Sequence, residues 1–437
     1  MAKGEKLYNF DLIEKGPNQC MVSLTVPYQN VDSVYQNAVL MQKNQANTYG
    51  FSQGSTPLSY IETTYKPNIL EHVKDLLFIH CIMNFLYESL CTKKIVIAGD
   101  PKLLDIVIDQ DKGAQFLFNI SKMNDIVDEK WKKINIKIAP RKNYKDIDKQ
   151  VSHFLEKEAE NKTSYKNDGI SYGDWVFFTM QLIDNAGLST FNEYEDQLWV
   201  KISEEETDQN LHELFIGRKT DEVFVTNNHY FQEYINNDFG LNYQFKIKII
   251  DFIRNAYFCV NLFKKHFHLK LDKEVHQKLI EVFSFRNDIS QRRETVENTL
   301  KSLVRQYYVA LPANLLERQK QQVLADVHVN PDYYVYKSQS DFKDKIKMLA
   351  EKQLREMIII DGISYQENIS VSDQDVFSYL NLMQRARTRG LLYFKIPSTK
   401  FNSQEVPLPH EIIKQYCLRE KTLNHVINYL TKKKASK

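Results

Sequence analysis

The spacing of apolar residues changes twice along this chain, and the two changes divide it into three parts. Residues 1–160 mix strand and helix patterns, residues 168–254 hold short strands separated by turns, and residues 255–437 are almost entirely helical. A single hydrophobic core stops growing near about 250–300 residues, and this chain is longer. The sequence therefore predicts a multidomain α+β protein, with an N-terminal α+β domain and arm, a small β-rich domain and a large all-α C-terminal domain.

Local patterns predict the elements of the first part. The alternating residues 21–27 end on proline, which favours an edge strand. Apolar residues at helical spacing predict helices, and the stripe on the longest of them ends in the polar residues His80 and Asn84. The predicted helices are 31–45, 68–91 and 146–160, and the further predicted strands are 116–120 and 134–138.

The second part shows strand-length apolar segments bounded by turn residues. Pairs such as Asn-Asn and the run Asp-Asn-Ala-Gly separate these segments, as expected for short antiparallel strands. The predicted strands are 175–182, 197–202, 222–226 and 242–250.

Charge and cysteine usage limit the classes of partner. Lys plus Arg number 58 and Asp plus Glu number 56, so the chain lacks the basic excess that binding along DNA requires, and we expect no DNA partner. The five cysteines form no CxxC pair, which favours reduced thiols in the cytoplasm. No window approaches the roughly 18 apolar residues of a membrane span, so no membrane partner is expected.

Motifs for metal and cofactor chemistry are weak. His266, His268 and His276 lack a convincing further ligand, and no glycine-rich phosphate loop or activated nucleophile occurs. We therefore expect no metal and no cofactor. The basic clusters 291–293 and 385–389 are typical of solvated helix faces, with an RNA-binding or client-steering patch as the alternative.

Several short motifs, in order along the chain, resemble the trigger factor family. Gly50, Phe51, Gly54 and Pro57 match four positions of its Gly-Phe-Arg-x-Gly-Lys-x-Pro loop. Further resemblances lie at residues 98–101, 144–148, 173–176, 311–317, 368–373 and 418–423. The resemblance implies an ATP-independent chaperone that binds nascent or unfolded polypeptides. It also implies an elongated molecule, with the first and last domains close together and the β-rich domain at a far end.

In this family the loop docks on the ribosome near the exit of the nascent chain. The corresponding residues here are Gly50, Phe51, Ser52, Gln53, Gly54 and Ser55. Ser52 and Ser55 stand where the family has Arg and Lys, and a hydroxyl cannot make the charge-assisted hydrogen bonds of those residues. We therefore expect weakened ribosome binding, with an ordinary helix–helix loop as the alternative.

The β-rich part resembles an FKBP-like prolyl isomerase domain. Such a domain needs an apolar, aromatic pocket rather than a nucleophile. The candidates for this catalytic pocket are Phe191, Tyr230, Tyr234 and Phe245, and the alternative is that they form plain domain core. Met180 and Leu182 depart from the family pattern, so we expect a weakened isomerase.

The helical part is expected to offer apolar surface to many unfolded segments. Methionines and aromatic residues suit weak, unspecific binding, although each could equally be helix core. The candidates are residues 333–336, Met348, residues 357–360 and residues 391–394. Two alternative functions remain open: a prolyl isomerase as the main activity, and a ribosome-independent holdase or assembly scaffold.

Overall fold

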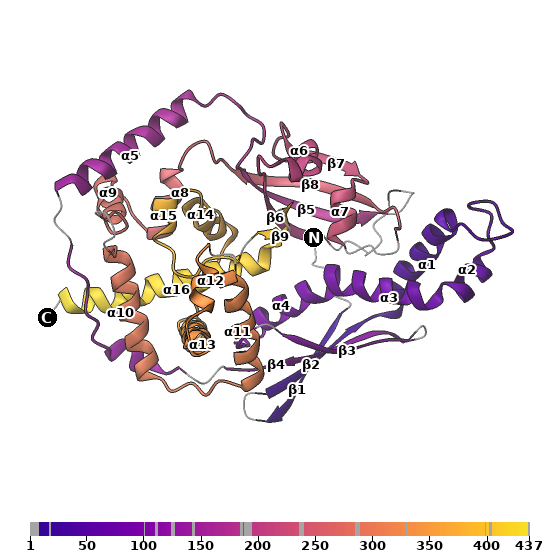
Figure 1. The fold of residues 1–437 in the computed structure, drawn as a ribbon, viewed down its shortest axis with the longest axis horizontal. Helices are drawn as coiled ribbons and strands as arrows, with labels where there is room; N and C mark the ends of the chain where they lie inside the picture. The colour runs from indigo at the N-terminus through magenta and orange to yellow at the C-terminus, as the bar shows by residue number, and fades with distance from the viewer. Residues whose placement is uncertain are drawn as a thin grey trace.

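The three parts of the sequence appear as a four-stranded sheet with helices, a five-stranded sheet and a group of helices (Figure 1). The computed structural model describes residues 8–16, 19–99, 101–109, 112–123, 127–141, 145–183, 187, 195–235, 240–284, 289–328, 331–397, 399–401 and 404–435. This arrangement confirms the predicted multidomain α+β class, with a C-terminal part that is mainly helical but also contains three two-residue strands. The domain boundaries at residues 160, 168 and 254 stay predictions.

An antiparallel sheet forms the base of the N-terminal part. Its strands lie in the order β1-β2-β4-β3. In the central pair, Val22 lies opposite Phe118 and Leu24 opposite Phe116, and these four side chains are buried beneath the helices. The strands are β1 (Asn9–Gly16), β2 (Gln19–Val26), β3 (Lys102–Asp109) and β4 (Gly113–Ile120). A Cβ on Gly113 would lie 2.1 Å from the carbonyl oxygen of Val26, so only glycine fits this turn.

Two strand predictions for this part are wrong. Residues 21–27 do not form an edge strand, because β2 pairs with β1 on one side and β4 on the other. Pro27 lies just past the last paired residue and precedes helix α1, where its missing N–H costs no ladder bond. Residues 134–138 alternate like a strand but follow a short 3-10 turn, Glu129–Lys133, as irregular chain.

The helices of the N-terminal part pack on one face of its sheet and then lead away from it. The predicted helices 31–45, 68–91 and 146–160 are confirmed with slightly different ends. They are α1 (Tyr28–Gln45), the pair α3 (Lys66–Leu77) and α4 (Met83–Thr92), and α5 (Lys145–Ser164). A short helix, α2 (Leu58–Thr64), lies between α1 and α3. A π-helical turn, Phe78–Ile82, joins α3 to α4, so the predicted long helix continues across it.

The β-rich part is a five-stranded antiparallel sheet in the order β11-β6-β5-β8-β7. Its members are β5 (Trp175–Ile183), β6 (Asp196–Lys201), β7 (Val223–Thr226), β8 (Gln244–Ile253) and β11 (Leu408–Pro409). The helices α6 (Gln209–Phe215) and α7 (His229–Tyr234) accompany it. The four strands predicted between residues 175 and 250 are confirmed, whereas the edge strand β11 comes from the C-terminal part of the chain.

The five-stranded sheet is buried on both faces. Val176 and Phe178 join a core shared with the N-terminal part, while Trp175 and Phe177 join a core shared with the helices. The alternation of side chains along β5 produces this division, because neighbouring residues point to opposite faces. The expectation that the β-rich domain lies at a far end is therefore wrong, since it packs against both other parts (Figure 1).

The C-terminal part surrounds two long helices. These are α13 (Phe342–Gln366) and α16 (His410–Ala435). The other helices are α8 (Val260–Phe267), α9 (Asp272–Ile280), α10 (Gln291–Gln306), α11 (Ala313–His328), α12 (Tyr333–Lys337), α14 (Asp373–Met383) and α15 (Ala386–Arg389). A two-stranded ladder of β9 (Lys400–Phe401) and β10 (Gln404–Glu405) precedes α16.

Candidate functional sites

The loop between α1 and α2, residues 46–57, is called the tip loop here. It contains two successive turns, in which Phe51 N donates to Thr48 O over 3.1 Å and Ser55 N donates to Ser52 O over 3.0 Å. The third residue of each turn is a glycine with positive φ, +86° at Gly50 and +80° at Gly54. A positive φ at this position is typical of a type II turn and disfavours other residues. The matched glycines therefore determine the shape of the loop.

The side chains of the tip loop are tied to one another. Ser52 Oγ donates to Ser55 Oγ over 2.9 Å, and Ser55 Oγ donates to Ser52 O over 2.6 Å. The ring of Phe51 lies 5.9 Å from that of Tyr60, centre to centre, and 39% of Phe51 is exposed. The predicted loop residues thus lie together at the projecting end of the N-terminal helices (Figure 1). Their role on the ribosome stays a prediction.

The candidate isomerase residues lie inside the β-rich part. Phe245 is fully buried, and Tyr230 is 6% exposed and donates its hydroxyl to Glu405 O over 2.8 Å. The ring of Tyr234 meets that of His80 edge-on at 6.5 Å. Phe191 lies outside the described residues. The structure gives Tyr230 and Phe245 the surroundings of core side chains, and their catalytic role stays a prediction.

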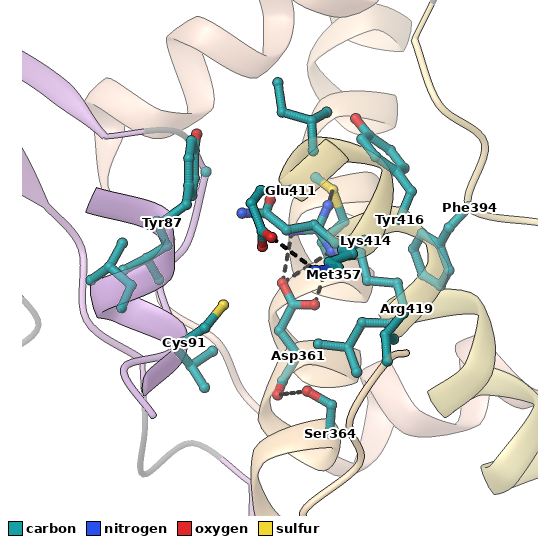
Figure 2. A pocket seen from close by; sticks show the side chains of 18 of the residues that line it. Tyr87, Cys91, Met357, Asp361, Ser364, Phe394, Glu411, Lys414, Tyr416 and Arg419 are labelled. Carbon is teal, nitrogen blue, oxygen red and sulfur yellow. Dashed lines mark hydrogen bonds and ion pairs between the residues drawn. The ribbon is translucent and has the colours of Figure 1, made fainter. Parts of the chain in front are cut away.

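A cavity of about 1840 Å³ lies where α4, α11, α13 and α16 meet, and is referred to as the central cavity. Helix α4 belongs to the N-terminal part, whereas the other three belong to the C-terminal part, so residues far apart in sequence face one another across it (Figure 2). Its apolar lining includes Met83, Tyr87, Leu90, Met357, Tyr365, Phe394 and Tyr416.

Only some of the predicted client-binding residues line the central cavity. Met357, Tyr393 and Phe394 do. Residues 358–360 and 391–392 are instead buried core, and residues 334–336 and Met348 are exposed at the outer end of the α11–α13 hairpin. The prediction missed the α4 wall, which includes Tyr87. The local sequence does not distinguish an apolar helix residue that faces a cavity from one that packs in the core, because the opposite wall of the cavity comes from a distant helix.

Acidic and basic side chains both line the central cavity, and four of them form two ion pairs within its walls. Arg419 donates to both oxygens of Asp361, with Nη2 2.8 Å from Oδ2, and Lys414 Nζ lies 3.0 Å from Glu411 Oε1 (Figure 2). A paired charge does not demand an opposite charge from a ligand. The cavity therefore combines apolar side chains with hydrogen-bonding groups and imposes no strong charge preference.

A buried carboxyl group reinforces one wall of the cavity. Glu356 is 2% exposed, and its Oε2 accepts a hydrogen bond from the Tyr393 hydroxyl over 2.7 Å. Burial raises the pKa of Glu356, and the Tyr393 hydrogen bond and the Lys352 charge oppose that rise. The same burial raises the pKa of the Tyr393 phenol above its usual range. This pair fixes the position of the Tyr393 ring at the cavity wall.

Polar side chains at the end of the α3–α4 stripe connect the N-terminal part to the five-stranded sheet. Asn84 Nδ2 donates to Asp196 Oδ1 over 2.8 Å, and His80 Nδ1 contacts Asp196 Oδ2. Nearby, His72 Nε2 lies 2.6 Å from the Tyr243 hydroxyl. These polar atoms are largely buried. Removing one partner of a contact therefore leaves the other partner without that hydrogen bond and weakens the attachment of the two parts to each other.

Within the described part of the chain, no three His, Cys, Asp or Glu side chains are grouped as metal ligands. No described helix has the length and apolar character needed to cross a bilayer.

Two family models and a known trigger factor are similar to this chain in sequence. The model of the bacterial trigger factor protein matches residues 9–156, and the model of its C-terminus matches residues 272–388, together more than half of the chain. The trigger factor of Desulfatibacillum aliphaticivorans is 18% identical over 431 residues, covering 93% of each chain. A solved structure described as "Promiscuous Substrate Recognition in Folding and Assembly Activities of the Trigger Factor Chaperone" shows 15% identity, covers 97% of this chain and 100% of the other, and gives a TM-score of 0.39. The chain belongs to the trigger factor family.

Proposed function

We propose that this protein is an ATP-independent chaperone that holds unfolded or nascent polypeptide segments in the central cavity. The observation that carries the proposal is the cavity itself. Its volume of about 1840 Å³ exceeds the roughly 300–1,000 Å³ of small-molecule sites. Apolar and aromatic side chains with internally paired charges suit segments of varied sequence, because no single partner is required for complementarity.

We propose a separate role for each of the three predicted domains. Residues 1–160 would carry the tip loop and dock on the ribosome near the exit tunnel in the cytoplasm, residues 168–254 would form the FKBP-like domain, and residues 255–437 would supply most of the client surface. The lack of Arg and Lys at Ser52 and Ser55 supports weakened docking. The burial of Tyr230 and Phe245 supports a weakened isomerase, since a substrate proline must reach an open apolar pocket.

Neutral polar substitutions in the cavity test the proposal. The double variant Met357→Gln/Tyr365→Gln replaces two lining side chains, of which Tyr365 is 37% exposed. Client affinity is expected to fall roughly five-fold, because the lost apolar contact is worth about 1 kcal/mol in total. The measurement is the chaperone concentration that halves aggregation of a chemically denatured enzyme, without nucleotide.

The matched control is Leu104→Gln/Val107→Gln, which changes two apolar residues on β3 that are 50% and 47% exposed. These residues do not line the central cavity. Equal weakening by both double variants, or by neither, would contradict the cavity as the client site. A wild-type chain that fails to slow aggregation at all would overturn the chaperone proposal.

A further inference from the structure

The tip loop lies within a stretch of sequence that has no charge. Residues 44–61 contain no Asp, Glu, Lys, Arg or His, although 26% of the chain is Asp, Glu, Lys or Arg. The flanking charges, Lys43 and Glu62, are of opposite sign. The stretch includes the end of α1, the whole tip loop and the start of α2. Its own side chains therefore cannot form a salt bridge with a phosphate or a carboxylate.

Aromatic side chains occupy the exposed positions instead. Tyr49 is fully exposed, and Phe51, Leu58 and Tyr60 are each about two-fifths exposed. The rings of Phe51 and Tyr60 lie 5.9 Å apart, centre to centre, and exposed apolar side chains gathered at a projecting end indicate an interaction surface. Aromatic residues are the side chains that most often dominate the binding energy of protein interfaces.

The loop is also well ordered by its own contacts. The two turns, the hydrogen bonds between Ser52 and Ser55, and the buried side chains of Thr56 and Ile61 fix its course. A ring side chain has few rotatable bonds, so ordering Tyr49 and Phe51 on a partner costs little conformational entropy. Rigid aromatic anchors among Ser, Gly, Asn and Gln are the composition with which antibody loops bind folded proteins.

We propose that the tip loop docks on the surface of a folded protein, with Tyr49 and Phe51 as anchors in an apolar, uncharged depression and neutral hydroxyl and amide groups around them. The inference rests on the proposed ribosome docking and specifies how it occurs. Binding to RNA phosphate is disfavoured, because such binding depends on Lys and Arg and weakens steeply with salt. A membrane surface is the other partner that exposed aromatic residues suit, and flotation with lipid vesicles distinguishes it from a folded protein.

The test is co-sedimentation of the full chain with purified ribosomes between about 50 and about 500 mM potassium chloride. Wild-type affinity is expected to change less than about two-fold over this range, because no counterions are released from phosphates. The variant Tyr49→Ser/Phe51→Ser is expected to bind at least about ten-fold more weakly. The control Leu104→Ser/Val107→Ser, exposed elsewhere on the N-terminal part, is expected to bind like wild type.

The variant Ser52→Arg/Ser55→Lys serves as a positive control. It adds two positive charges, so a plot of its log affinity against log salt concentration is expected to have a slope of roughly −1 to −2. If the affinity of wild type for ribosomes already falls this steeply with salt concentration, the tip loop binds RNA and the inference is overturned. Unchanged binding by Tyr49→Ser/Phe51→Ser would overturn it as well.

Two further outcomes also count against the inference. Flotation of wild type with phosphatidylglycerol vesicles, lost in the Tyr49→Ser/Phe51→Ser variant, would show that the tip binds a membrane. Failure of wild type to sediment with ribosomes at any salt concentration would reject both the proposed docking on the ribosome and the proposed role of Tyr49 and Phe51 as its anchors. The chaperone proposal is judged separately, because aggregation of a denatured client is measured without ribosomes.

Discussion

Replacing Arg292 by methionine is expected to lower the free energy of unfolding by about 3–5 kcal/mol. Its side chain is 2% exposed and donates from Nη2 to Glu420 Oε1 over 2.8 Å and from Nε to Leu391 O over 3.0 Å. Glu420 is fully buried, so the substitution leaves its carboxylate in the core without the paired charge. Urea unfolding followed by far-UV circular dichroism measures the loss.

The neighbouring Arg293 provides a matched control. It forms an ion pair with Glu297 over 3.0 Å, but the two side chains are 69% and 41% exposed. Arg293→Met is therefore expected to change stability by no more than about 1 kcal/mol, as for other surface pairs. Glu420→Met added to Arg292→Met is expected to recover only part of the loss, because no buried charge remains but Tyr393 N and Phe394 N lose Glu420 Oε2 as their acceptor. Similar losses for Arg292→Met and Arg293→Met would contradict this account of the core.

Asp196→Ala is expected to loosen the β-rich part from the N-terminal part. Asp196 is 4% exposed and accepts hydrogen bonds from His80 and Asn84, so its loss leaves the buried His80 and the partly buried Asn84 without this acceptor. The cost is about 1–3 kcal/mol, which raises the separated population roughly 5- to 150-fold. Faster hydrogen exchange of the α3–α4 amides and a larger radius of gyration are the expected observations.

Asp221→Asn, which removes the charge and tolerates the positive φ of this position, is the control for this prediction. Asp221 lies in the same β-rich part and pairs with Lys248 over 3.6 Å, but its side chain is 80% exposed. The substitution is expected to leave both the hydrogen exchange of α3–α4 and the radius of gyration unchanged. If Asp196→Ala also leaves them unchanged, the buried contacts of His80 and Asn84 do not hold the two parts together.

Local sequence patterns predicted those features that local physics determines. The helix of α1 follows from apolar residues at helical spacing, and the turns of the tip loop follow from Gly50 and Gly54, whose backbone angles other residues disfavour. The strand predicted at residues 134–138 failed because alternation alone does not provide a neighbouring strand to pair with.

Features made by distant segments could not be predicted in this way. His72 meets Tyr243 across 171 positions of sequence, and α4 faces α13 across the central cavity. The polar His80 and Asn84 on an otherwise apolar stripe were the one local indication that this face meets a polar partner. Their partner, Asp196, is identified only by the fold.

The central claim is that unfolded chains bind inside the cavity, and site-specific photo-crosslinking tests it most directly. A benzophenone side chain would replace Met357 on the cavity wall or, in a second variant, Val107 on β3. The account predicts that a denatured client crosslinks at position 357 without nucleotide, that position 107 gives little product, and that the folded client gives none at either position. Equal crosslinking at both positions, or none at position 357 while aggregation is still suppressed, would contradict it.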